Sequence, residues 1–192
     1  GQYRTMAGQS SCEVCPIGQG SHMSGVTGGA VFCYPCVPGK TNALEGQRNC
    51  VKCTKGRFMA IIGASKAECD PCVEGQYQNE EKQINCKACG AGKWSNQRGA
   101  NHEDVCIDCG VGRYSSAKGA TGLHDCNECA AGKNNANVGS NSSAACINCP
   151  VNTKSATEGS SKCVSCGTGA KSVEGSAKCV ECDAGKAGTG TG

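Results

Sequence analysis

The residues in this chain that could do chemistry are its cysteines. There are 20 of them in 192 residues, and every one belongs to a Cys-x-x-Cys pair. Thiols at this spacing can hold a metal ion, carry out thiol–disulfide exchange, or form structural disulfides. The surrounding residues must decide between these chemistries. The ten pairs are Cys12/Cys15, Cys33/Cys36, Cys50/Cys53, Cys69/Cys72, Cys86/Cys89, Cys106/Cys109, Cys126/Cys129, Cys146/Cys149, Cys163/Cys166 and Cys179/Cys182.

A zinc site would take four thiolates from two neighbouring pairs. Three pairs are followed by glycine, as zinc knuckles often are: Cys89-Gly90, Cys109-Gly110 and Cys166-Gly167. However, the segments between pairs are rich in Ser, Thr, Asn and Gly and vary from 12 to 17 residues. A redox-active pair would need a thioredoxin-like βαβ setting, which the sequence does not show. We therefore predict structural disulfides without metal or cofactor, and an intracellular array of four-cysteine zinc sites is a distant alternative.

Composition supports the disulfide interpretation. The chain has 2 Leu, 6 Ile, 13 Val and 2 Phe, which is few for burying a core in 192 residues. Cysteine exceeds a tenth of the chain, a level typical of secreted disulfide scaffolds. Closing a loop of about 15 residues with a disulfide stabilises the fold by roughly 3 kcal/mol in the chain-entropy model. Covalent cross-links are therefore expected to do what a hydrophobic core does elsewhere.

The residues between the pairs show the elements that position the cysteines. A glycine lies three residues after the second cysteine of nine pairs, and Asn152 takes that place in the tenth. Glycine and asparagine there predict a turn with positive φ. An aromatic often follows two residues later, at Phe58, Tyr77, Trp94 and Tyr114. A second glycine often lies four residues before the next pair, at Gly8, Gly29, Gly46, Gly159 and Gly175.

These features recur along the whole chain with a period of about 19 residues. We therefore predict one continuous array over residues 1–192, with about ten cysteine-rich repeats. The expected fold class is a small disulfide-rich repeat array, an elongated rod or superhelix of Cys-x-x-Cys-x-x-Gly units. Most of it should be turns with short β-hairpins. Gly1-Gln2-Tyr3 matches Gly75-Gln76-Tyr77, so the chain is expected to be a segment of a longer array.

Two pairing schemes fit the spacing. In a crossed scheme, pairs couple two at a time, for example Cys12–Cys33 with Cys15–Cys36. In a ladder scheme, the second cysteine of each pair joins the first of the next, and the mid-repeat ends favour it. Cys12 and Cys182 would then bond to cysteines outside the segment. The ladder bonds would be Cys15–Cys33, Cys36–Cys50, Cys53–Cys69, Cys72–Cys86, Cys89–Cys106, Cys109–Cys126, Cys129–Cys146, Cys149–Cys163 and Cys166–Cys179.

The unit Cys-x-x-Cys-x-x-Gly-x-Tyr, seen at Cys106–Tyr114 and Cys69–Tyr77, resembles the cysteine-rich repeats of ephrin receptors and tumour-necrosis-factor receptors. The tandem arrangement is also similar to the cysteine-periodic surface antigens of ciliates. The resemblance covers essentially the whole chain and implies an elongated, extracellular, ladder-like rod at a cell surface. The chain departs from the pattern where the aromatic is replaced, as at Asn134 and Lys154.

Other chemistry is poorly represented. His22, His102 and His124 are not spaced as metal ligands, and no nucleophile motif or carboxylate pair stands out. The net charge is +3 without a basic run, and no apolar stretch approaches the roughly 20 residues that span a bilayer. We therefore predict no enzyme activity, no nucleic-acid partner and no membrane span. Asn141-Ser142-Ser143 is a candidate N-glycosylation sequon in a polar loop.

The function predicted from these features is that of an extracellular or cell-surface structural or display protein, such as a stalk, coat or filament component. Its expected partners are itself, neighbouring repeats and glycans. The alternative is a receptor or adhesin ectodomain that binds a protein ligand. An exposed apolar patch at Phe32–Tyr34 or Phe58–Ile62 would favour that alternative.

Overall fold

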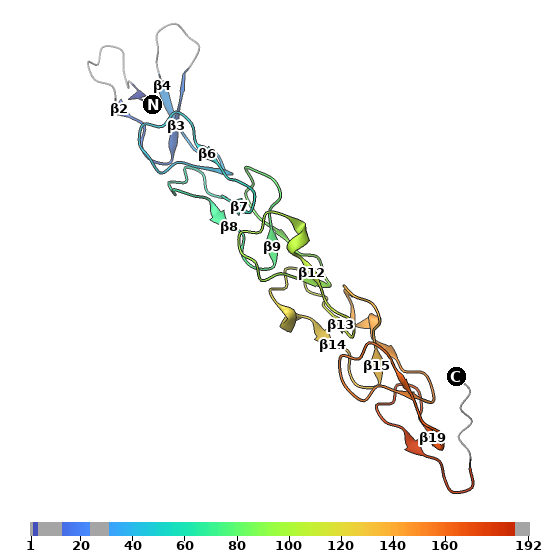
Figure 1. Cartoon of the computed structure of the whole chain (residues 1–192). Coiled ribbons are helices and arrows are strands. Elements are labelled where there is room, and N and C mark those ends of the chain that lie inside the picture. Colours follow the sequence, from blue (N-terminus) through green and yellow to red (C-terminus); the bar gives the residue numbers. More distant parts are fainter. Residues whose placement is uncertain (1, 4–12, 24–30, 187–192) are drawn as a thin grey trace. The chain divides into compact units, whose positions relative to one another are not determined.

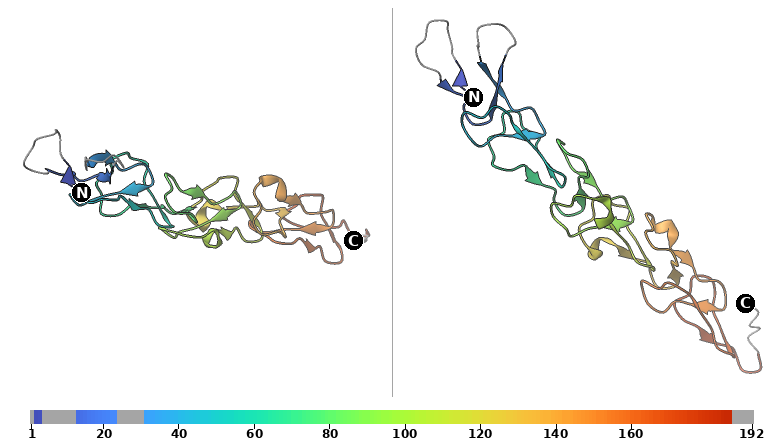
Figure 2. Two further views of the ribbon diagram at one scale, coloured as in Figure 1. Left: turned by 90° about the horizontal axis from the view of Figure 1, so that it is seen from above. Right: turned by 45° about the horizontal axis from the view of Figure 1, so that its top comes forward.

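The computed structural model describes residues 2–3, 13–23 and 31–186. Contacts between Cα atoms divide the chain into two compact units. Unit 1 is Gly1–Lys87 with Gln97–Val105, and unit 2 is Ala88–Asn96 with Cys106–Gly192. Within each unit, short strands and loops succeed one another in chain order, as the colours of Figure 1 show. The other views show the same succession inside each unit (Figure 2).

Each repeat forms one antiparallel β-hairpin, usually with two residues per strand. The first strand begins directly after the turn glycine, and the second is the x-x of the next Cys-x-x-Cys pair. Arg113 pairs with Glu128, and Tyr114 pairs with Asn127. The hairpins are short because a positive-φ turn precedes the first strand and disulfide-bonded cysteines flank the second. A disulfide-rich tandem array of short antiparallel hairpins is therefore confirmed.

The strands of unit 1 are β1 (Gln2–Tyr3), β2 (Glu13–Val14), β3 (Gln19–Met23), β4 (Val31–Pro35), β5 (Lys40–Thr41), β6 (Val51–Lys52), β7 (Arg57–Phe58), β8 (Asp70–Pro71) and β9 (Gln76–Tyr77). They pair as β1–β2, β3–β4, β5–β6 and β7–β8. Strand β10 (Lys87–Ala88) lies where the two units divide.

The strands wholly within unit 2 are β11 (Lys93–Trp94), β12 (Ile107–Asp108), β13 (Arg113–Tyr114), β14 (Asn127–Glu128), β15 (Lys133–Asn134), β16 (Ile147–Asn148), β17 (Thr153–Lys154), β18 (Val164–Ser165), β19 (Ala170–Lys171) and β20 (Val180–Glu181). They pair consecutively from β11–β12 to β19–β20. The helical segments among the described residues are 3-10 turns: η1 (Glu103–Val105), η2 (Leu123–Asp125) and η3 (Ser143–Ala145).

Nine disulfides join the second cysteine of one pair to the first cysteine of the next, which is the connectivity of the ladder scheme. The bonded Cα atoms lie 5.4–5.8 Å apart, within the ordinary range. Cys12 lies outside the described residues. Cys182 forms no disulfide here, and its bond to a cysteine outside the chain stays a prediction. The bonds are Cys15–Cys33, Cys36–Cys50, Cys53–Cys69, Cys72–Cys86, Cys89–Cys106, Cys109–Cys126, Cys129–Cys146, Cys149–Cys163 and Cys166–Cys179.

The turn after each described second cysteine has the predicted backbone conformation. The glycines at this position have φ between 74° and 86°, and Asn152 adopts φ 64°. Asparagine tolerates this conformation better than most residues, because its short polar side chain can hydrogen-bond locally. The prediction that Asn152 replaces glycine in a positive-φ turn is therefore confirmed.

A second positive-φ position, which the sequence did not predict as such, is common to the described loops. It lies seven residues after the turn residue, or six in the last case, and at Gly46, Gly159 and Gly175 it coincides with the glycine four residues before the next pair. The intervening 3-10 turn lengthens the distance to the next pair in three loops. The residues at this position are Gly46, Gly63, Lys82, Gly99, Gly119, Gly139, Gly159 and Gly175, with φ between 61° and 74°.

The interior contains cysteines and small or polar residues, with few large apolar side chains. Met59 is the largest fully buried side chain and packs with Cys53, Ala64 and Cys69. Of the four recurrent aromatics, only Tyr77 is buried. Residues such as Val51, Ile147 and Val164 are more than half exposed. The disulfides and backbone hydrogen bonds therefore hold the repeats together more than hydrophobic burial does.

Candidate functional site

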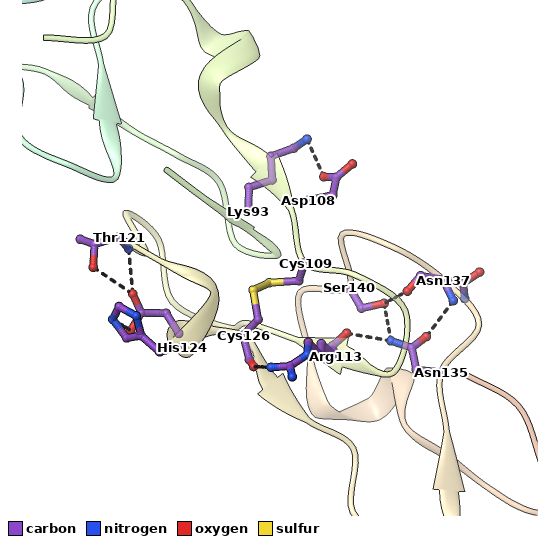
Figure 3. The surroundings of a disulfide bond; sticks show 11 residues. Lys93, Asp108, Cys109, Arg113, Thr121, His124, Cys126, Asn135, Asn137 and Ser140 are labelled. Atoms are coloured by element: carbon purple, nitrogen blue, oxygen red, sulfur yellow. Dashed lines mark hydrogen bonds and ion pairs between the residues drawn. A yellow bond between two sulfur atoms is a disulfide. The ribbon is translucent and has the colours of Figure 1, made fainter. Parts of the chain in front are cut away.

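The structural feature repeated throughout the chain is the junction between one repeat and the next. Figure 3 shows one junction, around the Cys109–Cys126 disulfide of unit 2. Here the turn residue Gly112 uses both of its backbone groups. Its N–H donates to the carbonyl of Asn135 (2.7 Å), and its carbonyl accepts from the N–H of Cys129 (2.8 Å). One turn thus binds the next repeat at two points.

Two further backbone bonds complete the junction. The Ser115 N–H donates to the Ser140 carbonyl (3.0 Å), and the Gly139 N–H donates to the Cys109 carbonyl (2.8 Å). Buried backbone groups need such partners, because leaving one unpaired away from water is costly. At the junction, the partners of these backbone groups come from the neighbouring repeat. In an ordinary sheet they would come from a third strand.

The same bonds recur in both units. The turn N–H donates to the following repeat in Gly18→Asn42, Gly39→Met59, Gly56→Gln78, Gly92→Ser115, Gly132→Ser155 and Asn152→Ser172. The second positive-φ residue donates to a cysteine carbonyl in Gly46→Cys15, Gly63→Cys36, Lys82→Cys53, Gly99→Cys72, Gly119→Cys89, Gly159→Cys129 and Gly175→Cys149. These junctions within the two units therefore repeat one hydrogen-bond pattern.

A buried polar side chain three residues after the turn adds a side-chain link. The Asn135 amide donates to the Arg113 carbonyl of the preceding repeat and to Ser140 Oγ, both at 2.9 Å. Its Oδ1 accepts from the Asn137 N–H (3.0 Å). Figure 3 shows all three bonds. Asn135 is only 1 % exposed, so it orders its own loop and binds the preceding repeat from the interior.

Equivalent side chains in other repeats make similar bonds. Asn42 donates to the Gln19 carbonyl (2.6 Å), and Ser172 Oγ donates to the Thr153 carbonyl (2.7 Å). This position was not predicted from the sequence, because its residues are polar and give no hydrophobic pattern. The available signal was the recurrence of Asn, Gln or Ser three residues after the turn. The buried polar residues there are Asn42, Gln78, Ser95, Ser115, Asn135, Ser155 and Ser172.

Turn glycines also approach the second repeat along the chain. A Cβ placed on Gly112 would lie 1.8 Å from the carbonyl oxygen of Gly159, far inside van der Waals contact. Equivalent Cβ atoms would lie 2.1 Å from Gly139 O at Gly92 and 2.0 Å from Gly175 O at Gly132. Glycine is therefore required here both by its positive φ and by the close carbonyl. Within each unit, these turns therefore contact the two repeats that follow.

Charged side chains lie on the exposed face of the hairpins. Lys93 Nζ is 2.7 Å from Asp108 Oδ1, across the β11–β12 pair. Arg113 pairs with Glu128 and also donates to the Cys126 carbonyl (3.1 Å). Exposed ion pairs contribute about 0–1 kcal/mol each, so they add little to the stability of the junction.

In unit 1, the pKa of Tyr77 departs from its ordinary value. Burial, followed by the negative charge and hydrogen bond of Glu103, raises the pKa of Tyr77 above its ordinary value. Lys87 opposes this shift. A raised tyrosine pKa keeps the phenol neutral and is the reverse of what a nucleophile requires. This arrangement is therefore structural.

Of the histidines considered from the sequence, His102 and His124 are exposed. His102 Nδ1 is 2.9 Å from Asp104 Oδ2, and His124 lies beside Asp125. The Thr121 backbone N–H first, with smaller contributions from His124, lowers the pKa of Asp125. The side chain of His22 lies outside the described residues. Eighteen cysteines are bonded to one another and have no thiolate to offer a metal. No group of three or more potential metal ligands occurs in the described part of the chain.

Trp94 and the apolar residues named from the sequence differ in exposure. The Trp94 indole nitrogen is buried and lacks a hydrogen-bond partner among the described residues, although the residue as a whole is only partly buried. Phe32, Tyr34, Ile61 and Ile62 are half exposed or more. Tyr34 also lines an open groove of about 500 Å³ in unit 1. The groove is lined by Gly20, Ser21, Tyr34, Pro35, Val37, Lys40, Arg48, Asn49 and Cys50.

Residues 61–106 match the family model described as "tyrosine-protein kinase ephrin type A/B receptor-like". The resemblance to ephrin-receptor cysteine-rich repeats is therefore confirmed over this segment. The matched segment is a cysteine-rich repeat domain, and the match indicates no catalytic family. No curated protein matches the chain. Among the described residues, no helix is both long enough and apolar enough to cross a membrane. The chain contains cysteine-rich, disulfide-bonded repeats of a kind typical of extracellular proteins.

Proposed function

We propose that this chain is a tension-bearing structural segment of an extracellular or cell-surface protein, such as a stalk, coat or filament component. The observation that carries the proposal is the ladder connectivity of the nine disulfides. When the chain is pulled from its ends, the shortest covalent path runs through each disulfide and then through one Cys-x-x-Cys pair. The long loops lie outside this path and bear no tension.

The distance between bonded Cα atoms shows how much each disulfide shortens the chain relative to an extended loop. Cys15 and Cys33 are 18 residues apart in sequence, but their Cα atoms are 5.5 Å apart. A fully extended segment of that length would span roughly 60 Å. The other eight bonds shorten their loops in the same way. An oxidised chain therefore resists extension even if its hydrogen bonds break, as a spacer under load must.

Single-molecule pulling of the whole chain tests this function. The oxidised chain should extend little after its folded structure opens. The same chain treated with a reductant should extend by several hundred ångströms more, because the loop residues freed from the disulfides can then be fully extended. A chain that extends equally far with and without reductant does not route tension through the disulfides, and the proposal is then wrong.

The second candidate function is a receptor or adhesin domain, favoured by the groove beside Tyr34. Lys40 and Arg48 line it together with Tyr34 and Val37, so it combines positive charge with apolar surface. Such a lining suits an acidic peptide that also carries an apolar side chain. The double variant Lys40→Glu/Arg48→Glu should abolish binding of the protein to the cell surface. Its disulfide connectivity should stay unchanged. Unchanged binding removes the groove from consideration.

A further inference from the structure

The three loops that contain 3-10 turns share one exposed position. It lies two residues after the second positive-φ glycine and is occupied by Asn101, Thr121 and Asn141. In each case a residue of the 3-10 turn follows two positions later: Glu103, Leu123 or Ser143. Only at Asn141 does this arrangement form Asn-x-Ser, the acceptor sequence for N-linked glycans.

The local geometry leaves the acceptor groups of Asn141 accessible. Asn141, Ser142 and Ser143 are all exposed. Ser142 has an extended backbone, with φ −151° and ψ 149°, and its Oγ accepts from the Ala144 N–H (3.2 Å). Ser142 thus begins the η3 turn with its own hydroxyl. The Ser143 hydroxyl is not used for this cap.

The base of the loop is anchored independently of Asn141. Asn135 bonds Ser140 Oγ, and the Ser140 carbonyl accepts from Ser115 in the preceding repeat. At the other end, the Cys146 N–H donates to the Ser143 carbonyl (3.0 Å). A group attached to the Asn141 side chain therefore projects from the loop without replacing any contact of the junction.

We infer that Asn141 carries an N-linked glycan, with a lipid-linked oligosaccharide diphosphate as the donor class. The inference rests on the proposed extracellular function, because the donor is met on the secretory route. In the transfer, the Asn141 amide nitrogen forms a bond to the anomeric carbon of the glycan. The bond from that carbon to the phosphate oxygen breaks, the lipid diphosphate leaves, and the amide nitrogen loses one proton.

The glycan would cover one side of the Cys129–Cys146 loop. Exposed loops are where proteases cut folded proteins, since the backbone must enter their active sites. A bulky, solvated group at Asn141 hinders that entry and adds solubility to a chain that exposes Ile147 and Val138 nearby. The glycan would thus protect a loop that lies outside the tension-bearing path.

The experiment expresses the complete chain in the secretory pathway of a eukaryotic cell. The secreted protein is treated with a glycan-removing amidase in ¹⁸O-labelled water, and its peptides are analysed by mass spectrometry. The expected result is ¹⁸O-labelled aspartate at position 141. Asn141→Gln and Ser143→Ala should each abolish the label. Ser142→Ala should retain it, because Ser142 is the variable middle residue of the acceptor sequence.

The structurally equivalent loop supplies the matched control. Glu103→Ser creates the same acceptor sequence at Asn101, and this site should also become glycosylated. A secreted, disulfide-bonded chain with an unmodified Asn141 overturns the inference, whether or not Asn101 of the variant is modified. A disulfide map on the same sample separates this outcome from failure of the extracellular proposal, in which free thiols would be found.

Discussion

Gly112 occupies a place where a methyl group would meet the backbone of another repeat. Its φ is 74°, and a Cβ at this position would lie 1.8 Å from the Gly159 carbonyl oxygen. Two separate penalties therefore oppose any side chain there. The conformational penalty alone is roughly 1–2 kcal/mol for an L-residue in the left-handed region. The steric penalty must force the two repeats apart, because backbone atoms cannot swing aside as side chains do.

We predict that Gly112→Ala destabilises the oxidised protein by more than about 2 kcal/mol, the upper end of the conformational penalty alone. Gly169→Ala, with φ 79° and open space around its Cβ, should lose only that conformational penalty. Gly110→Ala, with open space and no positive φ, should change stability little. Denaturant unfolding with intact disulfides measures the order. Equal effects of the Gly112 and Gly169 variants would show that the close approach is absent.

Lys82 is a further test of backbone strain. It occupies the second positive-φ position, with φ 61°, where the other described repeats have glycine. We predict that Lys82→Gly stabilises the protein by roughly 0.5–1 kcal/mol, because relief of the left-handed conformation exceeds the added freedom of the unfolded chain. Lys118→Gly, one residue before Gly119, should destabilise instead. A loss of stability in the Lys82 variant contradicts the strain argument.

Several of these residue-level features could be predicted from the sequence. The turn glycines and Asn152 were visible because their distance from cysteine is constant. The second positive-φ position was not predicted as such, because its distance to the following pair is not constant. The 3-10 turns fall between the glycine and that pair, so only counting forward from the turn preserves the register. Lys82 could not be identified by composition, since lysine has no preference for positive φ.

At the scale of the element, each hairpin depends on the loop that joins its strands and on the buried residue beside it. Asn135 is the clearest case, since its amide group makes bonds to Arg113, Asn137 and Ser140. Truncating it removes the side-chain partner of the Arg113 carbonyl and of the Asn137 N–H, both in part-buried hydrogen bonds. Each such loss costs about 1–3 kcal/mol.

We therefore predict that Asn135→Ala destabilises unit 2 by about 2–4 kcal/mol, somewhat less than the sum of independent losses because neighbouring groups rearrange. Asn137→Ala is the matched control, because Asn137 is exposed and enters the network through its backbone. Amide hydrogen exchange should accelerate at Gly112, whose N–H donates to the Asn135 carbonyl. Exchange that is equally unchanged in both variants would exclude a role for this side chain.

The 3-10 turns are insertions that the junction does not need. Loops with four residues from the second positive-φ residue to the cysteine, such as Gly159 to Cys163, form the same hairpin. Deleting Ser143–Ala145 would give the Gly139 loop that shorter spacing. We predict that the deletion variant still forms Cys129–Cys146 and keeps its unfolding midpoint within a few degrees. Mispairing of Cys146 in a disulfide map would show instead that η3 directs the pairing.

The element pattern was only partly predictable. The hairpins followed from the positions of turns and cysteine pairs, so their existence was expected. The buried polar position was not, because hydrophobic periodicity cannot reveal a core of serine and asparagine. The aromatics drew attention instead, but Phe58, Trp94 and Tyr114 are only partly buried. Tyr77, the buried one, is the exception.

At the scale of the whole molecule, the covalent ladder and the repeated junctions act together. Disulfides link each repeat to the next, and close backbone contacts within each unit reach the repeat after that. Stability in such an array is approximately a sum over neighbours. Loss of one junction is therefore expected to loosen nearby repeats and to leave distant ones in the same unit intact. Tension, in contrast, passes through every disulfide in series.

Sequence alone left two pairing schemes open, because cysteine spacing does not determine connectivity. The structure adds the geometric reason for the ladder. Hairpin pairing of Arg113 with Glu128 and Tyr114 with Asn127 accompanies a Cys109–Cys126 disulfide, in which Cys126 directly precedes the second strand and Cys109 precedes the turn. The hairpin and the disulfide thus close the same loop between two neighbouring Cys-x-x-Cys pairs.

Non-reducing peptide mapping by mass spectrometry, with a zinc assay on the same sample, tests the ladder most directly. The ladder predicts a cross-linked peptide that joins Cys109 to Cys126, a second that joins Cys129 to Cys146, and no zinc. Cross-links from Cys106 to Cys126 and from Cys109 to Cys129 would show the crossed scheme, in which the pairs couple two at a time. Free thiols with one zinc for every two pairs would contradict the disulfide array itself.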